Sequence, residues 1–496
     1  MPAGLALERP ATARNLVTAY YMILVSTALL VIIGFVMVVS STTVTKLTLD
    51  KSPYTQAVTQ GVYIAVGLIV AFCASRFRFA WWKPVAWGAF ILTLVLQAVT
   101  VLGAGISAGG NTNWLKVGGF SVQPSEFLKF ALALWLGTVL ANKKDRLDSW
   151  VELAVPALVG LVVAGGLVIL GNDVGTASVI GLLALGTLWT AGVPWRKLAA
   201  ITLVVVAVGA VAVLVSPSRL SRVKALLGGS AARDASRSTG WQTRQAAYAL
   251  ADGGLFGKGL GASHEKWSWL SQADSDFIFA IIGEELGLVG CLVVLVLFAV
   301  LIIGLLQVVR WHPDRFCQVT VGAIGCWIAV QAVINVGMVV QVLPVIGVPL
   351  PFVSSGGSAL VASMAAIGCV LGLMRGDPAV GPVLKASPQI MRDAFGLVAA
   401  APDAETHRRR KRRRRAARPA GTAAQGTPGR PVVASAVSDA DGPGRAGRSG
   451  REAAGSDGGA LVGARSGRGA RRGRGELFDV KEFDEVELQP HFWSQK

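Results

Sequence analysis

Long apolar runs alternate with short polar segments along most of the chain. Ten of these runs approach the roughly 20 residues that an α-helix needs to cross a bilayer. They lie near residues 19–40, 57–76, 81–103, 125–141, 152–171, 174–192, 197–215, 276–309, 317–342 and 356–375. The pattern predicts an all-α polytopic membrane protein, with about ten transmembrane helices over residues 19–375 and a short N-terminal segment, residues 1–18.

The composition agrees with a membrane protein, because 53% of the 496 residues are hydrophobic and only 15% are charged. The five cysteines lie in or beside the apolar runs, and their spacing fits no metal motif. We expect them to be small apolar packing residues and not a disulfide framework. They are Cys73, Cys291, Cys317, Cys326 and Cys369.

Clusters of lysine and arginine fall at alternate ends of the predicted helices. They read "SRFRFAWWK" (75–83), "NKKDR" (142–146), "PWRK" (194–197) and "RWHPDR" (310–315). The positive-inside rule predicts that these ends face the cytoplasm. Both termini of this multi-pass membrane protein are then cytoplasmic, and the longest loop, about 216–275, lies outside.

The net charge of +18 comes partly from arginine blocks near residues 407–415 and 465–475. Alanine, glycine, proline and serine flank these blocks, so residues 376–496 are predicted to be a disordered cytoplasmic tail. Arginine blocks beside a membrane favour anionic lipids, and we do not expect nucleic-acid binding. The acidic and aromatic end, 476–493, is interpreted either as a motif that orders on a partner or as a solvated end.

Carboxylates stand at the start of and within one apolar run, in "QADSDFIFAIIGEELG" (272–287). Asp276 beside the long outer loop can stay hydrated and ionised, either as a helix cap or as a general base. Glu284 inside the span is a functional candidate by default, and we expect it to tune packing or the local field. A helix that begins at Asp276 places Glu285 on the opposite face from a stripe of Ala280, Gly283, Glu284, Gly287 and Gly290.

Other polar residues of the spans have two interpretations each. Glu126 and Lys129 share a helix face, either as an ion pair or as a site for an anionic headgroup. Asp173 follows an apolar run in "GNDVGTAS" and suits a helix cap. Gln331 and Asn335, four residues apart, more often bond to neighbouring helices than to a substrate.

Several separated segments together carry a resemblance to a known family. They read "WLKVGGFSVQPSEFLK" (114–129), "NDVGTA" (172–177), "GWQTRQAAYALADGGLFGKGLG" (240–261), "DSDFIFAIIGEELGLVG" (274–290) and "PLPFVSSGGSAL" (349–360). Over about residues 15–375 the chain resembles the SEDS family of shape, elongation, division and sporulation proteins, and among them the septal peptidoglycan glycosyltransferases. The resemblance implies a ten-helix SEDS fold and a location in the bacterial plasma membrane, at the division septum.

The resemblance also implies an activity, which is the polymerisation of lipid II into β-1,4-linked glycan strands at the outer membrane face during cell division. The aspartate of the family's "DFIF" motif matches Asp276 and is the implied catalytic base. The motif lysine matches Lys129, and the "PDLGT" aspartate matches Asp173, although Asn172 and Val174 replace its neighbours. Many members have an arginine where this chain has Asn113.

Cofactor and partner predictions follow from the same resemblance. A divalent cation, Mg²⁺ or Mn²⁺, is implied without a recognisable ligand set. The implied partners are a class B penicillin-binding transpeptidase and other proteins of the division septum, including FtsZ through the tail. Cationic candidates for the substrate diphosphate are Lys129, Arg219, Arg222, Arg244 and Lys258. Glu126 and Asp173 are the acidic candidates for contact with the substrate.

Two other functions compete with the septal polymerase. One is a transporter that flips lipid II along a polar route formed by Glu284, Glu285, Gln331 and Asn335. The other is an elongation polymerase of the RodA type, which shares nearly every motif. A scaffold that recruits division proteins through the tail is compatible with any of these functions.

Overall fold

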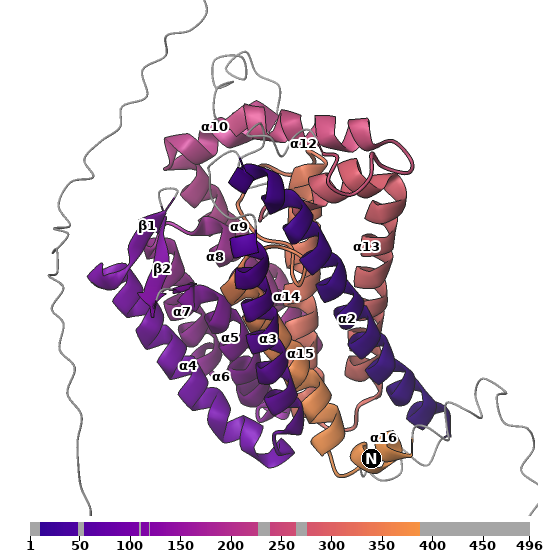
Figure 1. Cartoon of the computed structure of the whole chain (residues 1–496). Coiled ribbons are helices and arrows are strands. Elements are labelled where there is room, and N and C mark those ends of the chain that lie inside the picture. The colour runs from indigo at the N-terminus through magenta and orange to yellow at the C-terminus, as the bar shows by residue number, and fades with distance from the viewer. Residues whose placement is uncertain are drawn as a thin grey trace, which may run out of the picture. The chain divides into compact units, whose positions relative to one another are not determined.

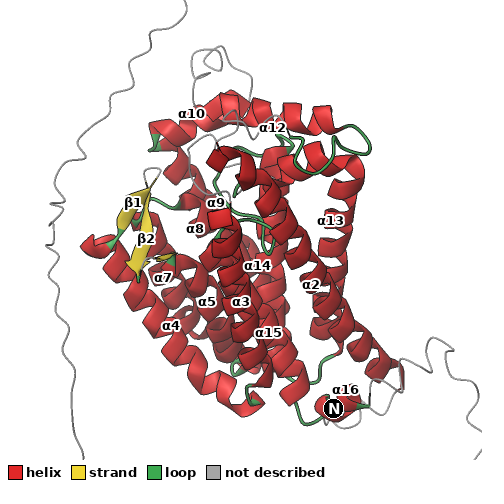
Figure 2. Cartoon of the chain, in the orientation of Figure 1, coloured by secondary structure: helices red, strands yellow, loops and turns green. Residues whose placement is uncertain are grey.

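The computed structural model describes residues 10–47, 54–108, 111–118, 120–226, 239–263 and 275–386, and these residues are mostly helical (Figures 1 and 2). The long helices are α2 (Pro10–Leu47), α3 (Tyr54–Arg76), α4 (Trp82–Val99), α5 (Pro124–Ala141), α7 (Val159–Leu170), α8 (Val174–Thr190), α9 (Trp195–Leu214), α13 (Ile278–Trp311), α14 (Arg315–Val339) and α15 (Gly357–Gly376). Shorter helices are α6 (Trp150–Leu153), α10 (Pro217–Leu226), α12 (Thr239–Gly253) and α16 (Gly381–Lys385).

Among the described residues, nine helices are long and apolar enough to cross a membrane. The remaining predicted span, 174–192, corresponds to α8, an apolar helix of 17 residues. The bounds of the predicted spans agree with those of the helices to within a few residues, with two exceptions. Helix α2 is longer at both ends, and the span 152–171 is divided into α6, a π-helical turn (Ala154–Leu158) and α7. The predicted fold class, a polytopic helical membrane protein, is confirmed.

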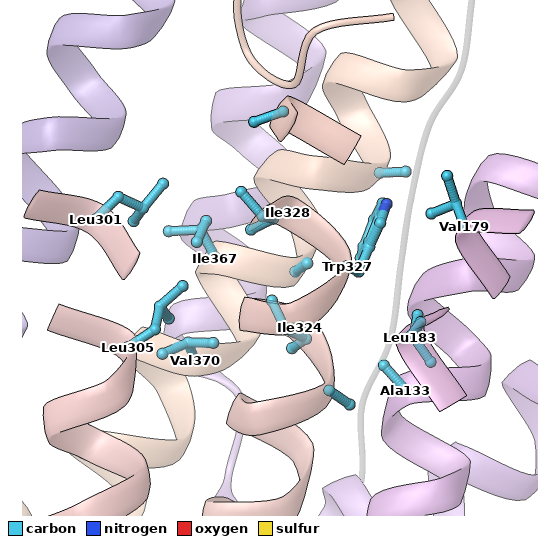
Figure 3. Close-up of a cluster of buried hydrophobic side chains, with 14 of the residues drawn as sticks. Ala133, Val179, Leu183, Leu301, Leu305, Ile324, Trp327, Ile328, Ile367 and Val370 are labelled. Carbon is cyan, nitrogen blue, oxygen red and sulfur yellow. The ribbon is translucent and has the colours of Figure 1, made fainter. Parts of the chain in front are cut away.

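Three helices form the centre of the bundle. Buried residues make up 94% of the apolar window of α15, 83% of that of α5 and 72% of that of α14, but only 6% of that of α9. The apolar side chains of α9 therefore face the lipid. Figure 3 shows the core, in which Ile324 and Trp327 of α14 lie between side chains of α13 and α8.

Small residues set the close contact between α15 and α3. A Cβ atom on Gly368 would lie 2.4 Å from the carbonyl oxygen of Ala71, and one on Gly372 would lie 2.5 Å from that of Ala74. Two glycines four residues apart thus let the α15 backbone pack directly on α3, as in other close helix pairs of membranes.

A small antiparallel sheet interrupts the helices between α4 and α5, where the sequence indicated only a loop rich in turns. Its strands are β1 (Ile106–Ala108), β2 (Asn111–Val117) and β3 (Phe120–Val122), in the order β1-β2-β3. The amide of Thr112 donates to the carbonyl of Gly171, 3.1 Å away, and this bond ties the sheet to the turn between α7 and α8.

Figure 1 shows α10 and α12 lying across one end of the bundle, with α16 at the opposite end. The fold continues past the last predicted span to residue 386, because Asp377 Oδ1 accepts hydrogen bonds from the amides of Ala379 and Val380, and Val380 is fully buried. Residues 387–496, which carry the rest of the predicted tail, lie outside the described part of the chain.

Candidate active site

Asp276 lies in a turn, Ser275–Phe277, that precedes α13 at the end of the bundle covered by α10 and α12. The first helical residue is Ile278 and the N-cap is Phe277. The prediction that the helix begins at Asp276 is therefore wrong by two residues, and this carboxylate is not the helix cap. Asp276 is half-buried, so it sits at the boundary between the core and the surface.

Hydrogen bonds to backbone carbonyls hold this turn against α14 and the loop between α14 and α15. Asn335 Nδ2 donates to the carbonyl oxygens of Asp276, at 2.9 Å, and Val348, at 2.8 Å. Ser354 Oγ donates to the carbonyl of Ser275, 2.6 Å away, and accepts from the amide of Leu350, 2.8 Å away. Each side chain therefore joins the Asp276 turn to the loop. The sequence indicated that Asn335 bonds to neighbouring segments of the protein, but it gave no signal for Ser354.

Asp276 shares its surroundings with Arg222 of α10. A Cβ atom on Gly347 would lie 3.5 Å from Asp276 Oδ2, so the loop backbone passes directly beside the carboxylate. Arg222 donates to the carbonyl of the nearby Val345, 3.2 Å away. Burial lowers the pKa of Arg222, and Arg219 lowers it further, while the charge of Asp276 raises it. An arginine never loses its proton at working pH, so a half-buried cation accompanies the carboxylate.

The remaining cationic candidates are dispersed over this end of the bundle. Arg219 donates to the carbonyls of Asn172, at 2.7 Å, and Ala212, at 3.2 Å. Lys258 forms an ion pair with Asp252, and Arg244 is exposed on α12. Arg222, by contrast, interacts electrostatically with Asp276.

Lys129 and Glu126 meet as predicted, but both are 1% exposed. Lys129 Nζ donates to Glu126 Oε1 and to Gln331 Oε1, each 2.8 Å away, and lies 5.2 Å from the ring of Trp327. Gln331 also accepts from Trp327 Nε1 at 2.7 Å and donates to the carbonyl of Pro349 at 2.8 Å. A buried ion pair thus supports the same loop that holds the Asp276 turn.

Asp173 is the N-cap of α8, as one of its two interpretations required. Its carboxylate accepts from the Thr176 amide at 2.9 Å and from the Thr176 hydroxyl at 2.7 Å. It also accepts from Asn113 Nδ2 at 2.9 Å and Gln123 Nε2 at 3.2 Å. Asn113 thereby ties β2 to α8. Four protein donors give Asp173 a structural role, and its contact with substrate stays a prediction.

The continuous stripe of small residues predicted along α13 is wrong, because the helix breaks at Gly287, which has φ 68° and ψ −167°. The loop after α12 replaces the lost helical hydrogen bonds. Amides of Lys258 and Gly259 donate to the carbonyls of Glu284 and Glu285, and the amides of the two residues after Gly287 donate to the carbonyls of Gly254 and Leu255, all at 2.9–3.2 Å. This exchange explains the glycines of "GGLFGKGLG".

The two glutamates before the break face different neighbours, as predicted, and both are fully buried. Glu284 accepts from the Ser263 hydroxyl at 2.5 Å, and Glu285 accepts from the Ser40 hydroxyl of α2 at 2.6 Å. Ser40 also accepts from the amide of Gly261 at 3.0 Å. The carboxylates therefore anchor the loop after α12 and the end of α2, which fits the tuning role expected of Glu284.

The protein groups around Asp276 do not form a recognisable cation site. Within the described ranges, no three His, Cys, Asp or Glu side chains lie close enough to hold one metal ion. A Mg²⁺ ion needs six ligands in near-octahedral geometry, and a single carboxylate supplies one or two of them. We therefore derive no step through a metal.

Comparisons with known proteins agree with this architecture. The probable peptidoglycan glycosyltransferase FtsW of Mycobacterium tuberculosis is 35% identical over 370 residues, which cover 74% of this chain and 70% of that protein. Stage V sporulation protein E of Bacillus subtilis is 32% identical, over 71% of this chain and 96% of that protein.

Solved structures show the same fold. A chain from a peptidoglycan synthase complex that coordinates polymerization and crosslinking matches with a TM-score of 0.57 and 24% identity, over 71% of this chain and 96% of that one. The crystal structure of the rod shape determining protein RodA of Thermus thermophilus matches with a TM-score of 0.51 and 25% identity, over 70% and 94%. The sequence model of the FtsW, RodA and SpoVE cell cycle proteins matches residues 20–377, and the chain belongs to this family.

Proposed function

We propose that this chain is a peptidoglycan glycosyltransferase that polymerises lipid II, with Asp276 as its general base. The observation that carries the proposal is the turn that presents Asp276, which is held by two backbone-directed hydrogen bonds and accompanied by the half-buried Arg222. Its relatives named peptidoglycan glycosyltransferase match over about 70% of the chain.

The reaction requires a base, an alignment and a stabilised leaving group. Asp276 takes the proton from the acceptor's GlcNAc 4-hydroxyl as that oxygen attacks C1 of the donor's MurNAc. The C1–O bond to the pyrophosphate breaks, and the bonding pair leaves with the lipid pyrophosphate. One carboxylate is enough, because a pyrophosphate leaves without protonation, and the inverting displacement converts the α-linkage into a β-1,4 bond. A positioned base contributes roughly 10²–10⁴-fold to such a step.

Positive charge must meet the pyrophosphate as it departs. Arg222 is the proposed group for this role because its charge interacts with that of Asp276, and Arg219 neighbours it on α10. Arginine suits a diphosphate because its planar guanidinium offers two parallel donors. Arg244 and Lys258 reach the same end of the bundle. Lys129 already donates to two protein acceptors, so we assign it to support of the loop as well as to the predicted substrate contact.

The proposed orientation places the Asp276 end outside the cell and both termini in the cytoplasm. It rests on the lysine and arginine clusters that alternate between the helix ends. Residues 75–83, 142–146 and 310–315 all lie at helix ends away from the Asp276 turn. A base on the outer side acts on substrate that has already crossed the membrane.

The transporter alternative loses support because its polar route is occupied by protein contacts. Glu284 and Glu285 accept hydrogen bonds from serines, Gln331 accepts from Lys129 and Trp327, and Asn335 donates to two carbonyls. These groups hold loops together in the described structure. A septal role, in preference to elongation, is favoured by relatives named FtsW that are up to 36% identical.

Proposed partners follow from the function and from the tail. A strand polymerase needs a transpeptidase for crosslinking, and a class B penicillin-binding protein is the proposed one. The end of the tail, residues 476–493, lies outside the described residues. We retain the proposal that it binds a division protein such as FtsZ, with anionic lipids holding the arginine blocks. A 476–496 peptide whose binding ignores Phe478→Ala and Phe483→Ala and follows salt alone would leave only nonspecific attraction.

One experiment separates the enzyme from the transporter. The purified chain is reconstituted in liposomes with labelled lipid II, with and without Mg²⁺, and the products are resolved on a gel. The proposal predicts a ladder of glycan strands that muramidase digests. Movement of lipid II between leaflets with no ladder under any condition would establish the transporter.

A further inference from the structure

An apolar cavity of about 170 Å³ lies where α8, α13 and α14 meet, in the half of the bundle away from Asp276. The residues that line it include Trp189 and Thr190 of α8, Leu306 and Val309 of α13, and Gly325 and Ala329 of α14. Trp189 is 67% exposed and Leu306 is 50% exposed, so the cavity opens toward the lipid-facing side of the bundle. Figure 3 shows the adjoining core, with Leu305 on one wall.

Glycines shape the α8 and α14 walls of this cavity. A Cβ atom on Gly322 would lie 2.6 Å from Thr190 Cγ2, and one on Gly186 would lie 2.2 Å from Cys326 Sγ, so α8 and α14 approach closely. Three residues further along α14, a Cβ atom on Gly325 would meet only Leu305 of α13, at 3.5 Å. The cavity wall at Gly325 therefore carries no side chain, and a larger residue there would extend into the cavity.

Cationic side chains stand at the end of the cavity nearest the membrane surface. Arg310 follows the lining residue Val309, lies one helical turn beyond Leu306 on the same face, and is exposed. Arg315 donates to the carbonyl of Ala191, 2.5 Å away, immediately after the lining residue Thr190, and its buried Nε has no protein acceptor in the described residues. The carboxylate of the neighbouring Asp314 is engaged as the N-cap of α14.

We propose that this cavity binds one acyl chain of an anionic phospholipid, whose phosphate pairs with Arg310 and Arg315. The apolar walls take the chain, the exposed Trp189 suits the interfacial region, and the two arginines complement the negative headgroup. The site is separate from the arginine blocks of the tail and does not depend on the reaction at Asp276. The bound lipid would fill the seam between α8 and the α13–α14 pair.

The test measures retained lipid and not activity. The full chain is reconstituted in nanodiscs of phosphatidylglycerol and phosphatidylethanolamine, transferred to detergent, and examined by native mass spectrometry. The wild type should retain one phosphatidylglycerol. Gly325→Leu should lower its retention about tenfold, because excluding two methylene groups costs about 0.8 kcal/mol each. Gly209→Leu is the matched control, since a Cβ atom there meets nothing within 4 Å and α9 faces lipid.

Two arginine variants test whether charge determines the binding of the headgroup. Arg310→Gln should lower phosphatidylglycerol affinity about fivefold, as expected for one basic residue near a charged surface. Arg375→Gln, an exposed arginine at the same end of the bundle on α15, should leave it unchanged. Ala329→Phe provides a second way to fill the cavity if Gly325→Leu does not fold. The proposal is overturned if the wild type retains no lipid, if folded filled variants retain as much as the wild type, or if phosphatidylethanolamine is held equally well.

Discussion

Gly287→Ala should destabilise the fold by about 2–5 kcal/mol. The residue has φ 68° and ψ −167°, a region that only glycine adopts readily and that costs other residues about 1–3 kcal/mol. A Cβ atom would also lie 2.4 Å from the Gly257 amide nitrogen and 2.5 Å from the Leu255 carbonyl oxygen. Pushing the loop away weakens up to four backbone hydrogen bonds, each contributing about 0.5–1.5 kcal/mol.

Relief of this strain would straighten α13 and displace the Asp276 turn at its start. The variant should therefore unfold at a lower temperature and polymerise lipid II more slowly. Thermal unfolding in detergent measures the first effect, and hydrogen exchange at Leu288 and Val289 locates it. Gly209→Ala on the lipid-facing α9 is the matched control, because its Cβ atom meets nothing. A Gly287→Ala protein as stable as that control, with both amides still protected, would refute the explanation of the break.

Three further predictions concern the support of the site and the opposite end of the bundle. Ser354→Ala should lower kcat while leaving the KM for lipid II nearly unchanged. Ser354→Thr keeps a hydroxyl and should recover part of the rate, so equal losses for both variants would argue against a role of the hydrogen bond to Ser275. Lys129→Met should cost about 3–5 kcal/mol by leaving the Glu126 carboxylate buried without its cation, and adding Glu126→Gln should restore stability in thermal unfolding. Burial lowers the pKa of His312, against opposing effects of Asp377 and Asp314, so the folded state resists its protonation. Stability should therefore fall as the pH drops below the unfolded-state value of about 6.5 and toward the lower folded-state pKa, and His312→Gln should flatten that part of the profile.

The sequence predicted the helices well because each needs about 20 consecutive apolar residues, a signal that is local. It also predicted the Glu126–Lys129 contact, which depends on spacing within one helix. The break at Gly287 escaped prediction, since a glycine in an apolar helix usually only marks close packing. Its cause is a loop about 30 residues earlier in the chain that supplies the missing hydrogen bonds.

Long-range contacts explain the other differences. Ser354 was missed because a serine in a loop rich in glycine and serine carries no signal of its partner, which lies 79 residues away. Asp173 had a cap signal, but its donor Asn113 lies in β2 of the small sheet and Gln123 lies between β3 and α5, and nothing in the turn-rich sequence indicated strands. Arg222 could be grouped with other cations by charge alone, and only the fold sets it beside Asp276.

The central claim is that the Asp276 carboxylate is the base for glycosyl transfer. The most direct measurement is single-turnover polymerisation of labelled lipid II by purified wild type and Asp276→Asn, with thermal unfolding and lipid II binding measured on the same samples. The substitution is nearly isosteric and keeps the backbone bonds from Asn335 and Ser354, so folding and binding should be retained. The account predicts a rate at least about 10²-fold lower. A folded Asp276→Asn protein that makes glycan strands at the wild-type rate would contradict it.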